Sequence, residues 1–310
     1  MKSKTVIWLL VLTYLLTGCD LDGPMEECDY GVRLRFHYSR EGSANCIRDY
    51  VTTITDYLYD EQGRLVETTT RTDVRIPQRT LSLPPGKYTL VSWGNLAEKT
   101  LVQPSVEAGT PFADMQLVQN HPHTAGQSWQ RNSERLHYGR TEFTVQEFGV
   151  VDRTVFMGHA YLDLTVTVVG LKGVPGEEFT LRLDGTHPVY GMDHYRQINA
   201  QGYPMYIPRP DEAQESTHLI SAVRMGSEGT LQDEFLTYRL TNRSLPVFSV
   251  WQGNVQVLRN VDLKHFFDTM LIDMDTNECQ EFHIRITVEG DNVYVQFVSL
   301  GDWIDGGSIG

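Results

Sequence analysis

The residues of this chain that could do chemistry are four cysteines and a few histidines close to carboxylates, as in Asp184-Gly185-Thr186-His187 and Asp193-His194. Acid–base catalysis needs such groups to converge in space, which neighbouring positions in sequence do not establish. The chain contains no P-loop, no G-x-S-x-G elbow, no H-E-x-x-H and no dinucleotide-binding glycine motif. We therefore name no catalytic residue, and we expect no enzyme activity and no cofactor.

Two segments have metal-ligand residue types. His121-Pro122-His123 needs further ligands to close a site, so a solvated loop is the better interpretation. Asp273, Asp275, Asn277 and Glu278 superficially resemble a calcium loop, but they lack the central glycine and the twelfth-position carboxylate of an EF-hand. We expect a polar turn there and no metal.

Cys19 differs from the other cysteines because of the residues that precede it. Lys2 and Lys4 form a positive n-region, and Val6 to Leu16 form an apolar run of eleven residues. Thr17-Gly18 then supply small residues for signal peptidase. A run of this length is too short to span ~30 Å of hydrocarbon as a helix. Residues 1–18 are therefore predicted to be an export signal.

The segment Leu16-Thr17-Gly18-Cys19 resembles the bacterial lipobox. The resemblance implies that Cys19 receives a diacylglycerol thioether, that cleavage falls before it, and that its new amino group is acylated. The alternative is an ordinary signal peptide with a chance cysteine, although such peptides usually leave a spacer after the apolar run. Several acyl chains, at about 0.8 kcal/mol per buried CH₂, would hold the protein to a membrane permanently.

Three cysteines remain for an oxidising compartment: Cys28, Cys46 and Cys279. They allow three single-bridge pairings, and one thiol must be left over. We favour a Cys28–Cys46 disulfide because the two lie close in sequence and flank a predicted strand.

The charge of the chain argues against nucleic acid as a partner. The formal net charge of −14 becomes −16 once Lys2 and Lys4 leave, and no basic cluster remains to neutralise nucleic-acid phosphates. A hydrophobic fraction of 40% is ordinary for a folded chain. The 292 residues after the signal suggest two domains, with the acidic Gly-Pro segment at residues 19–27 as a solvated tether.

The rest of the chain is dominated by strand patterns. Apolar and polar residues alternate most clearly at Val32–Tyr38, Ala160–Val168 and Phe282–Val288. Residues 97–135 lack such a period and are predicted to be mainly long connections. Helical spacing occurs at Asp262–Ile272, behind the possible caps Asn260 and Asp262. The fold class is therefore all-β, two antiparallel β-sandwiches at 28–152 and 153–310, with one short helix in the second.

The order of motifs resembles the FimB-type fimbrial subunit family of Bacteroides-like bacteria, which build type V fimbriae. It is carried by the lipobox, by Cys28-Asp29-Tyr30-Gly31-Val32-Arg33-Leu34-Arg35-Phe36, by Tyr57-Leu58-Tyr59-Asp60-Glu61-Gln62-Gly63-Arg64-Leu65-Val66 and by Leu83-Pro84-Pro85-Gly86-Lys87-Tyr88-Thr89-Leu90-Val91-Ser92-Trp93-Gly94-Asn95. Later in the chain only the alternating strands and Asp302-Trp303 support it.

The resemblance implies two transthyretin-like sandwiches, a lipid anchor in the outer membrane at the cell surface, and a subunit at the base of a fimbria that also limits its length. It implies a fimbrial shaft subunit as the partner, joined by β-strand complementation. A base subunit should keep its N-terminal segment, so we expect Arg33, Arg35 and Arg40 to stay uncleaved. The alternative is a surface lipoprotein that binds a glycan or host ligand through a sandwich face, with exposed rings such as Trp129 or Trp251 as the platform. A surface hydrolase would need a pocket where a carboxylate and a histidine meet.

Overall fold

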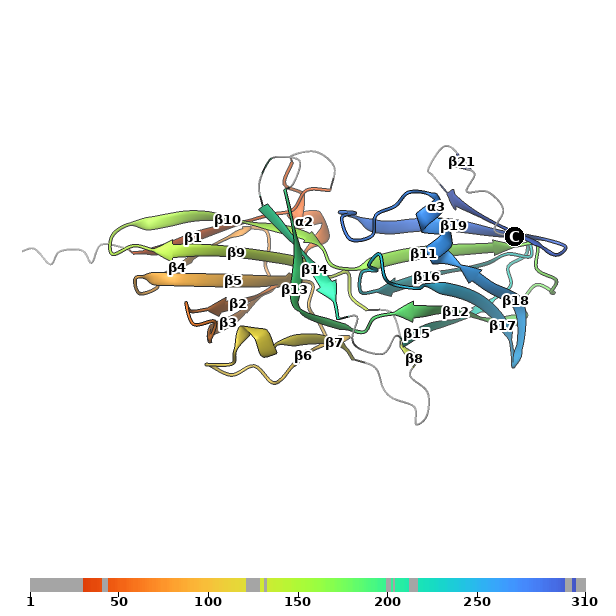
Figure 1. Ribbon diagram of the computed structural model, residues 1–310, viewed down its shortest axis with the longest axis horizontal. Helices are drawn as coiled ribbons and strands as arrows, with labels where there is room; N and C mark the ends of the chain where they lie inside the picture. Colours follow the sequence, from red (N-terminus) through yellow and green to blue (C-terminus); the bar gives the residue numbers. More distant parts are fainter. Residues whose placement is uncertain are drawn as a thin grey trace, which may run out of the picture.

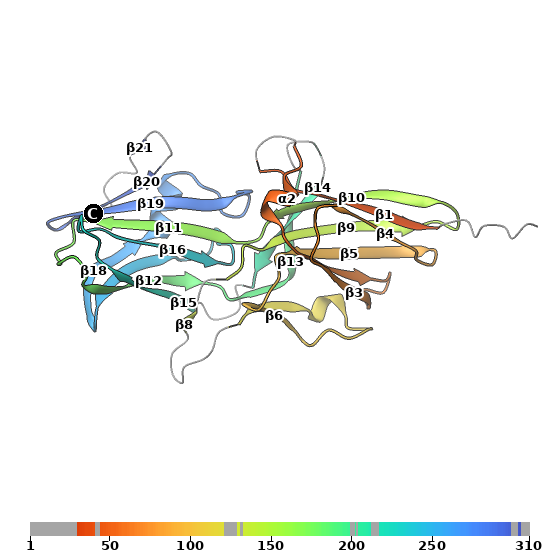
Figure 2. The same ribbon diagram turned by 180° about the vertical axis from the view of Figure 1, so that it is seen from behind.

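The computed structural model describes residues 30–40, 44–120, 129–130, 133–198, 202, 204–211, 217–298 and 303–304. Nearly all regular structure in these residues is β-strand, and the strands form an elongated molecule of two lobes placed along its long axis (Figures 1 and 2). The all-β fold class predicted from the alternating sequence is confirmed.

The N-terminal lobe contains a seven-stranded sheet in the order β3-β2-β5-β9-β10-β1-β4. The strands are β1 (Gly31–His37), β2 (Ile54–Tyr59), β3 (Leu65–Arg71), β4 (Gln78–Leu81), β5 (Gly86–Gly94), β9 (His137–Val145) and β10 (Val150–His159). A short helix, α2 (Ile47–Tyr50), connects β1 to β2.

The seven-stranded sheet folds over itself at β10. Residues Val150–Phe156 of β10 pair in parallel with β1, whereas Met157–His159 pair antiparallel with β9. Strands β1 and β10 therefore pack on β2, β5 and β9 and enclose a common core. Its buried side chains include Val32, Leu34, Phe36, Ile54, Leu58, Leu90, Phe143 and Val155. Each such apolar side chain contributes roughly 1.5–3 kcal/mol by leaving water.

A four-stranded sheet in the order β14-β13-β7-β6 covers the other face of β2, β5 and β9. Its strands are β6 (Thr100–Gln103), β7 (Gln116–Gln119), β13 (Val189–Ile198) and β14 (Pro204–Pro210), and a 3-10 turn, η1 (Phe112–Asp114), precedes β7. Aromatic rings lie between the two layers, where Trp93 of β5 is tilted against Tyr190 of β13 with 5.7 Å between the ring centroids.

The C-terminal lobe is a sandwich of two five-stranded sheets. One sheet has the order β16-β11-β19-β20-β21 and the other β18-β17-β12-β15-β8. The strands are β8 (Trp129–Gln130), β11 (Leu162–Val169), β12 (Glu178–Thr186), β15 (Thr217–Arg224), β16 (Leu231–Thr237), β17 (Val247–Gln252), β18 (Val255–Asp262), β19 (Gln280–Glu289), β20 (Asn292–Val298) and β21 (Trp303–Ile304). Alternate residues of β11, β12, β17 and β19 meet in one buried core.

The predicted helix is present as α3 (Leu263–Thr269) in the C-terminal lobe. The Asp262 side chain caps it by accepting a hydrogen bond from the backbone N–H of His265 at 2.9 Å. Phe266 and Phe267 are buried beneath the helix, where Phe266 contacts Phe297 and Phe267 contacts Phe282. The apolar face predicted from the sequence therefore packs α3 against β19 and β20.

The expected domain boundary between residues 152 and 153 does not coincide with the point where the chain passes from one lobe to the other. That boundary falls inside β10, whose exposed residues Asp152 and Arg153 interrupt its apolar period. The chain passes between lobes after β10, at Ala160-Tyr161, and β13 then returns to pair with β7 of the first half. Independent folding of two domains stays a prediction.

Residues 97–135 also differ from the expectation of long connections, because they contain β6, η1, β7 and β8. Each of these elements has only two to four residues. A segment that short completes at most two periods of alternation, so the sequence pattern does not separate it from a loop.

Candidate functional site

The N-terminal end of the described chain lies at one tip of the molecule. β1 begins beside the β9–β10 turn, where Gly31 N–H donates to the carbonyl of Gly149 at 3.3 Å. This turn is at the end of the N-terminal lobe that faces away from the C-terminal lobe (Figure 1). β1 therefore starts at this tip of the molecule.

β1 is an inner strand of its sheet, with β10 on one side and β4 on the other. Its residues Val32, Leu34 and Phe36 are buried, while Arg33 and Arg35 point outward and form ion pairs with Asp152. Removal of β1 would expose two neighbouring strands and part of the core. The strand predicted to contain Arg33 and Arg35 is thus confirmed.

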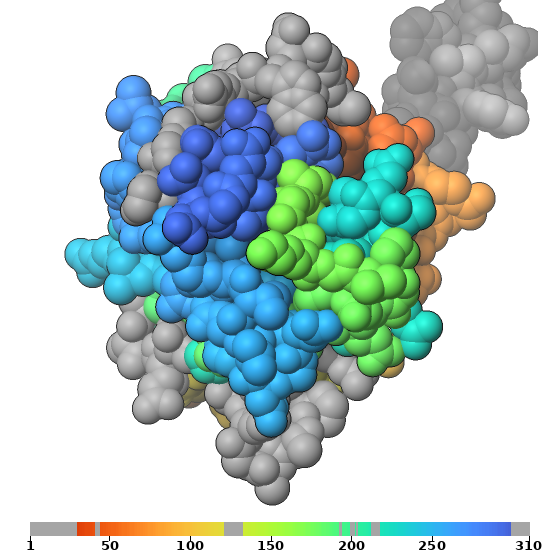
Figure 3. Space-filling view, turned by 90° about the vertical axis from the view of Figure 1, so that its right-hand side faces the viewer, coloured from red at the N-terminus to blue at the C-terminus, as the bar shows by residue number. Residues whose placement is uncertain are grey.

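The opposite tip is formed by turns of the C-terminal lobe. Four chain reversals meet there: the β11–β12 connection, the β15–β16 turn, the β17–β18 turn and the β19–β20 turn (Figure 3). Gly170, at φ +83°, ends β11 with its α-carbon so close to the Val288 carbonyl that an added Cβ would lie 2.2 Å from that oxygen. Val174 and Val255 are exposed at this end.

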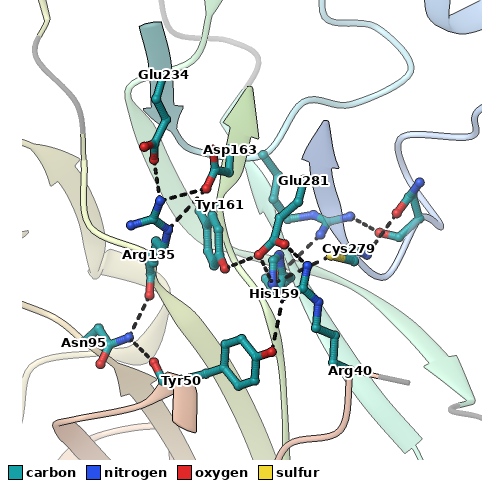
Figure 4. A network of polar contacts seen from close by, with 12 residues as sticks. Arg40, Tyr50, Asn95, Arg135, His159, Tyr161, Asp163, Glu234, Cys279 and Glu281 are labelled. Carbon is teal, nitrogen blue, oxygen red and sulfur yellow. Dashed lines mark hydrogen bonds and ion pairs between the residues drawn. The ribbon is translucent and has the colours of Figure 1, made fainter. Parts of the chain in front are cut away.

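A polar network joins the two lobes (Figure 4). Arg135, before β9, donates to Asp163 of β11 at 2.9 Å and to Glu234 of β16. The backbone carbonyl of Arg135 accepts a hydrogen bond from Asn95, which also donates to the Tyr50 carbonyl. These contacts couple α2, β9 and β11 across the junction.

A second part of the network converges on Glu281 at the start of β19. Tyr161 donates to Oε1 of Glu281 at 2.7 Å, and Arg40 forms an ion pair with its Oε2. Nε2 of His159, the last residue of β10, lies 3.3 Å from the same Oε1 and 3.9 Å from Sγ of Cys279. Beside it, the fully buried Arg239 donates to the carbonyl of His159 at 3.2 Å.

The ionisation of this cluster follows from its burial and its hydrogen bonds. Burial lowers the pKa of His159 and raises the pKa of the Cys279 thiol to about 11. Burial would also raise the pKa of Glu281, but hydrogen bonds from His159 and Tyr161 outweigh it and lower that pKa to about 2. At neutral pH the cluster therefore holds a carboxylate, a neutral imidazole and a protonated thiol.

The cluster does not have the geometry of a cysteine hydrolase. In such a triad the nucleophile and the acid contact opposite ring nitrogens of the histidine. Here Cys279 and Glu281 both approach Nε2 of His159. The thiol is also not activated, because its pKa is raised.

Two of the four cysteines, Cys46 and Cys279, lie within the described residues, and both are free thiols there. Cys19 and Cys28 lie outside the described residues, so lipidation of Cys19 and the Cys28–Cys46 disulfide stay predictions. Cys46 is partly buried after β1, with its Sγ 3.3 Å from the Tyr38 carbonyl. His121-Pro122-His123 also lies outside the described residues.

Asp184 and Asp273, two of the carboxylates selected from the sequence, take part in local structure, whereas the Asp193 side chain lies outside the described part of the chain. Asp184 contacts Arg182 and His218. Asp273 accepts hydrogen bonds from Asn242 at 2.8 Å and from the backbone of Asp275, as expected for a polar turn. His194 contacts Arg140 and the ring of Tyr206.

A pocket of about 490 Å³ opens on the N-terminal lobe. Its charged groups are largely paired: Lys87 lies 3.4 Å from Glu61, and Arg140 donates to Glu142 at 2.8 Å. Asp60 accepts hydrogen bonds from the backbone of its own turn. These carboxylates thus contact cationic side chains and backbone N–H groups. A catalytic base would instead contact the nucleophile that it activates.

Sequence reasoning did not find His159, Tyr161, Glu281 or Arg40 as partners. His159 ends β10 and Glu281 lies in β19, whereas Arg40 follows β1 and Tyr161 lies between β10 and β11. Their positions differ by up to 241 in the sequence. The one indication in the sequence was that Cys279 remained unassigned in a chain predicted to be exported.

Among the described residues, no helix is long and apolar enough to cross a membrane. Comparison with curated proteins found no match to the sequence. The chain is similar in fold to the fimbrial anchor protein Mfa2 from Porphyromonas gingivalis, with 16% identity and a TM-score of 0.64 over 89% of this chain and 98% of that one.

Two further solved structures share the fold. A proposed adhesin from Bacteroides thetaiotaomicron has 16% identity and a TM-score of 0.62 over 87% of this chain and 97% of its own. A proposed polysaccharide-binding protein from the same species has 11% identity and a TM-score of 0.64 over 87% and 98% of the two chains.

The sequence itself matches a family model described as fimbrillin-A associated anchor proteins Mfa1 and Mfa2, over residues 25–304. This match covers nearly all of the chain after the predicted signal and agrees with the resemblance seen in its motifs. The protein is a member of the family of fimbrillin-A associated anchor proteins.

Proposed function

We propose that this protein is an outer-membrane lipoprotein of the cell surface that anchors the base of a fimbria and limits its length. The observation that carries the proposal is the position of β1, an inner strand that begins at the tip opposite the C-terminal lobe. A lipid on Cys19 would enter the membrane on that side. The C-terminal lobe would then project away from the membrane.

The partner in this proposal is a fimbrial shaft subunit that adds a strand to a sheet edge. Backbone N–H and C=O groups along an edge strand attract another strand, and pockets for alternate side chains give selectivity. β18 is an edge strand of the C-terminal sandwich. Bulges in its pairing with β17 make this edge less regular and so less suited to adding another strand. β3 borders the N-terminal sheet and is more regular. The proposal leaves open which edge the partner uses.

Deletion of the gene, followed by complementation, tests the anchor. Loss of the protein should release fimbriae into the medium and alter their length, and the wild-type gene should restore cell-bound fimbriae. Complementation with Cys19→Ala should not, because that variant lacks the thiol for lipidation. Incorporation of labelled fatty acid into wild type and Cys19→Ala checks the lipid directly.

Two results would contradict the proposal. One is a deletion strain that keeps cell-bound fimbriae of normal length. The other is a mature surface protein that begins well after Cys28, since it would have lost the lipid site. Labelling of the Cys19→Ala protein would contradict the lipobox assignment alone.

Glycan binding is a second candidate, favoured by the neighbour that is described as a proposed polysaccharide-binding protein. Trp251 does not offer a free ring platform, because it is partly buried and donates to Ser249 at 3.0 Å. The Trp129 side chain is outside the described set. Binding of cell-surface glycans by the purified protein, with unchanged fimbriae in the deletion strain, would favour this function.

A further inference from the structure

We infer that His159, Cys279 and Glu281 form a binding site for a zinc ion at the junction of the lobes. Their potential ligand atoms are Nε2, Sγ and a carboxylate oxygen, and all lie within 4.8 Å of one another. Figure 4 shows the three side chains near one another, with the Arg40 guanidinium beside them. The inference does not depend on the anchoring function.

Two of the three separations between these atoms are close to those around a tetrahedral ion. Zinc binds His nitrogen and carboxylate oxygen at about 2.0–2.2 Å and Cys sulfur at about 2.3 Å, so neighbouring ligands of a tetrahedron are about 3.2–3.7 Å apart. The observed separation is 3.3 Å from His159 Nε2 to Glu281 Oε1 and 3.9 Å from that nitrogen to Cys279 Sγ. Small side-chain movements would complete the coordination.

A zinc site explains why Cys279 and Glu281 both approach the same ring nitrogen of His159. A catalytic triad would place the sulfur and the carboxylate on opposite nitrogens. Metal ligands, in contrast, must point at the same centre. The mixed nitrogen, sulfur and oxygen set favours zinc over magnesium or calcium, which prefer oxygen ligands alone.

Neighbouring contacts already orient the ligands. Tyr161 donates to Glu281 Oε1, which also lies 3.3 Å from His159 Nε2, and Arg40 pairs with Oε2. The backbone N–H of Cys279 donates to Asn277 Oδ1 at 2.9 Å. Hydrogen bonds to the ligating residues commonly fix their orientation toward a metal. A water molecule would supply the fourth ligand.

The position of the site suggests its role. His159 ends β10 of the N-terminal lobe, whereas Cys279 and Glu281 stand at the start of β19 in the C-terminal lobe. A metal bound to all three would link the two lobes directly. It would stiffen the junction against bending or pulling.

Cobalt(II), a spectroscopic substitute for zinc, tests the site in the purified full-length lipoprotein, kept reduced with a non-thiol reagent. The wild-type protein should bind one Co²⁺ with a thiolate-to-metal absorption band and tetrahedral d–d bands, and Zn²⁺ should displace it. Cys279→Ser should lose the thiolate band and bind zinc at least tenfold more weakly. Cys46→Ser is the matched control, because it removes the other described cysteine, and should behave as wild type.

Thermal unfolding separates metal binding from misfolding. Zinc should raise the Tm of wild type and of Cys46→Ser but not that of Cys279→Ser. Glu281→Gln keeps the size of the side chain, and it should also weaken zinc at least tenfold. Absence of a thiolate–cobalt band in wild type, its persistence in Cys279→Ser, or unchanged zinc affinity in Glu281→Gln would overturn the site.

Discussion

One buried carboxylate, that of Asp56, connects the two edge strands of the N-terminal sheet. Asp56 on β2 is 1% exposed and accepts a hydrogen bond from Ser92 at 2.6 Å. Arg71 on β3 and Arg79 on β4 both reach its Oδ2, at 3.3 and 3.2 Å. Since β3 and β4 are the two ends of the seven-stranded sheet, this buried carboxylate ties its edges together.

Replacement of Asp56 should therefore be strongly destabilising. Asp56→Ala would leave two poorly exposed guanidinium groups without their buried partner, a change that typically lowers the free energy of unfolding by roughly 3–5 kcal/mol. Asp73→Ala is the matched control, because Asp73 forms an exposed pair with Arg75, and it should leave the urea midpoint unchanged. Equal midpoints for the two variants would show that the Asp56 cluster does not hold the sheet ends.

At the scale of elements, the sequence predicted those strands whose pattern is set by one buried face. β1, β11 and β19 alternate regularly, and all three were expected at nearly their observed positions. β10 and β13 were missed for a physical reason. Asp152 and Arg153 interrupt β10, and β13 contains a glycine and several polar residues, so pairing with distant strands stabilises them more than their own pattern does.

The candidate junction site was less predictable than the strands. Its members lie in separate parts of the sequence, and only the fold brings Arg40, His159 and Glu281 together. An isolated histidine or arginine at the end of a strand has no periodic signature. Such a site follows from one sequence only when the order of the strands within their sheets is also determined.

Helix α3 offers an element-scale test. Asp262 accepts from the His265 N–H, so Asp262→Ala should lower the free energy of unfolding by about 1 kcal/mol. Asp262→Asn should retain most of the stability because asparagine is an equally good N-cap. Chemical denaturation measures both variants. An equal loss in the two would assign the effect to the charge of Asp262 instead of its capping bond.

At the scale of the whole molecule, the two tips have different roles in the proposed anchor. β1 starts at one tip, and the turns of the C-terminal lobe form the other (Figures 1 and 3). Between them, the polar network and the buried Arg239 connect the lobes. A load applied at one end would thus pass through paired strands and the junction before it reached the N-terminal segment.

A site-specific protease sequence inserted between Gly23 and Pro24 tests this path on intact cells. Cleavage there should release the protein together with its fimbriae, because the predicted tether is the only covalent link to the lipid. The control carries the same insertion in the β9–β10 turn between Phe148, which is 75% exposed, and Gly149. Cleavage of that turn should leave the fimbriae on the cell, since β9 stays paired with β5 and β10 stays paired with β1. Fimbriae that remain cell-bound after complete cleavage of the tether would show that another attachment carries the load.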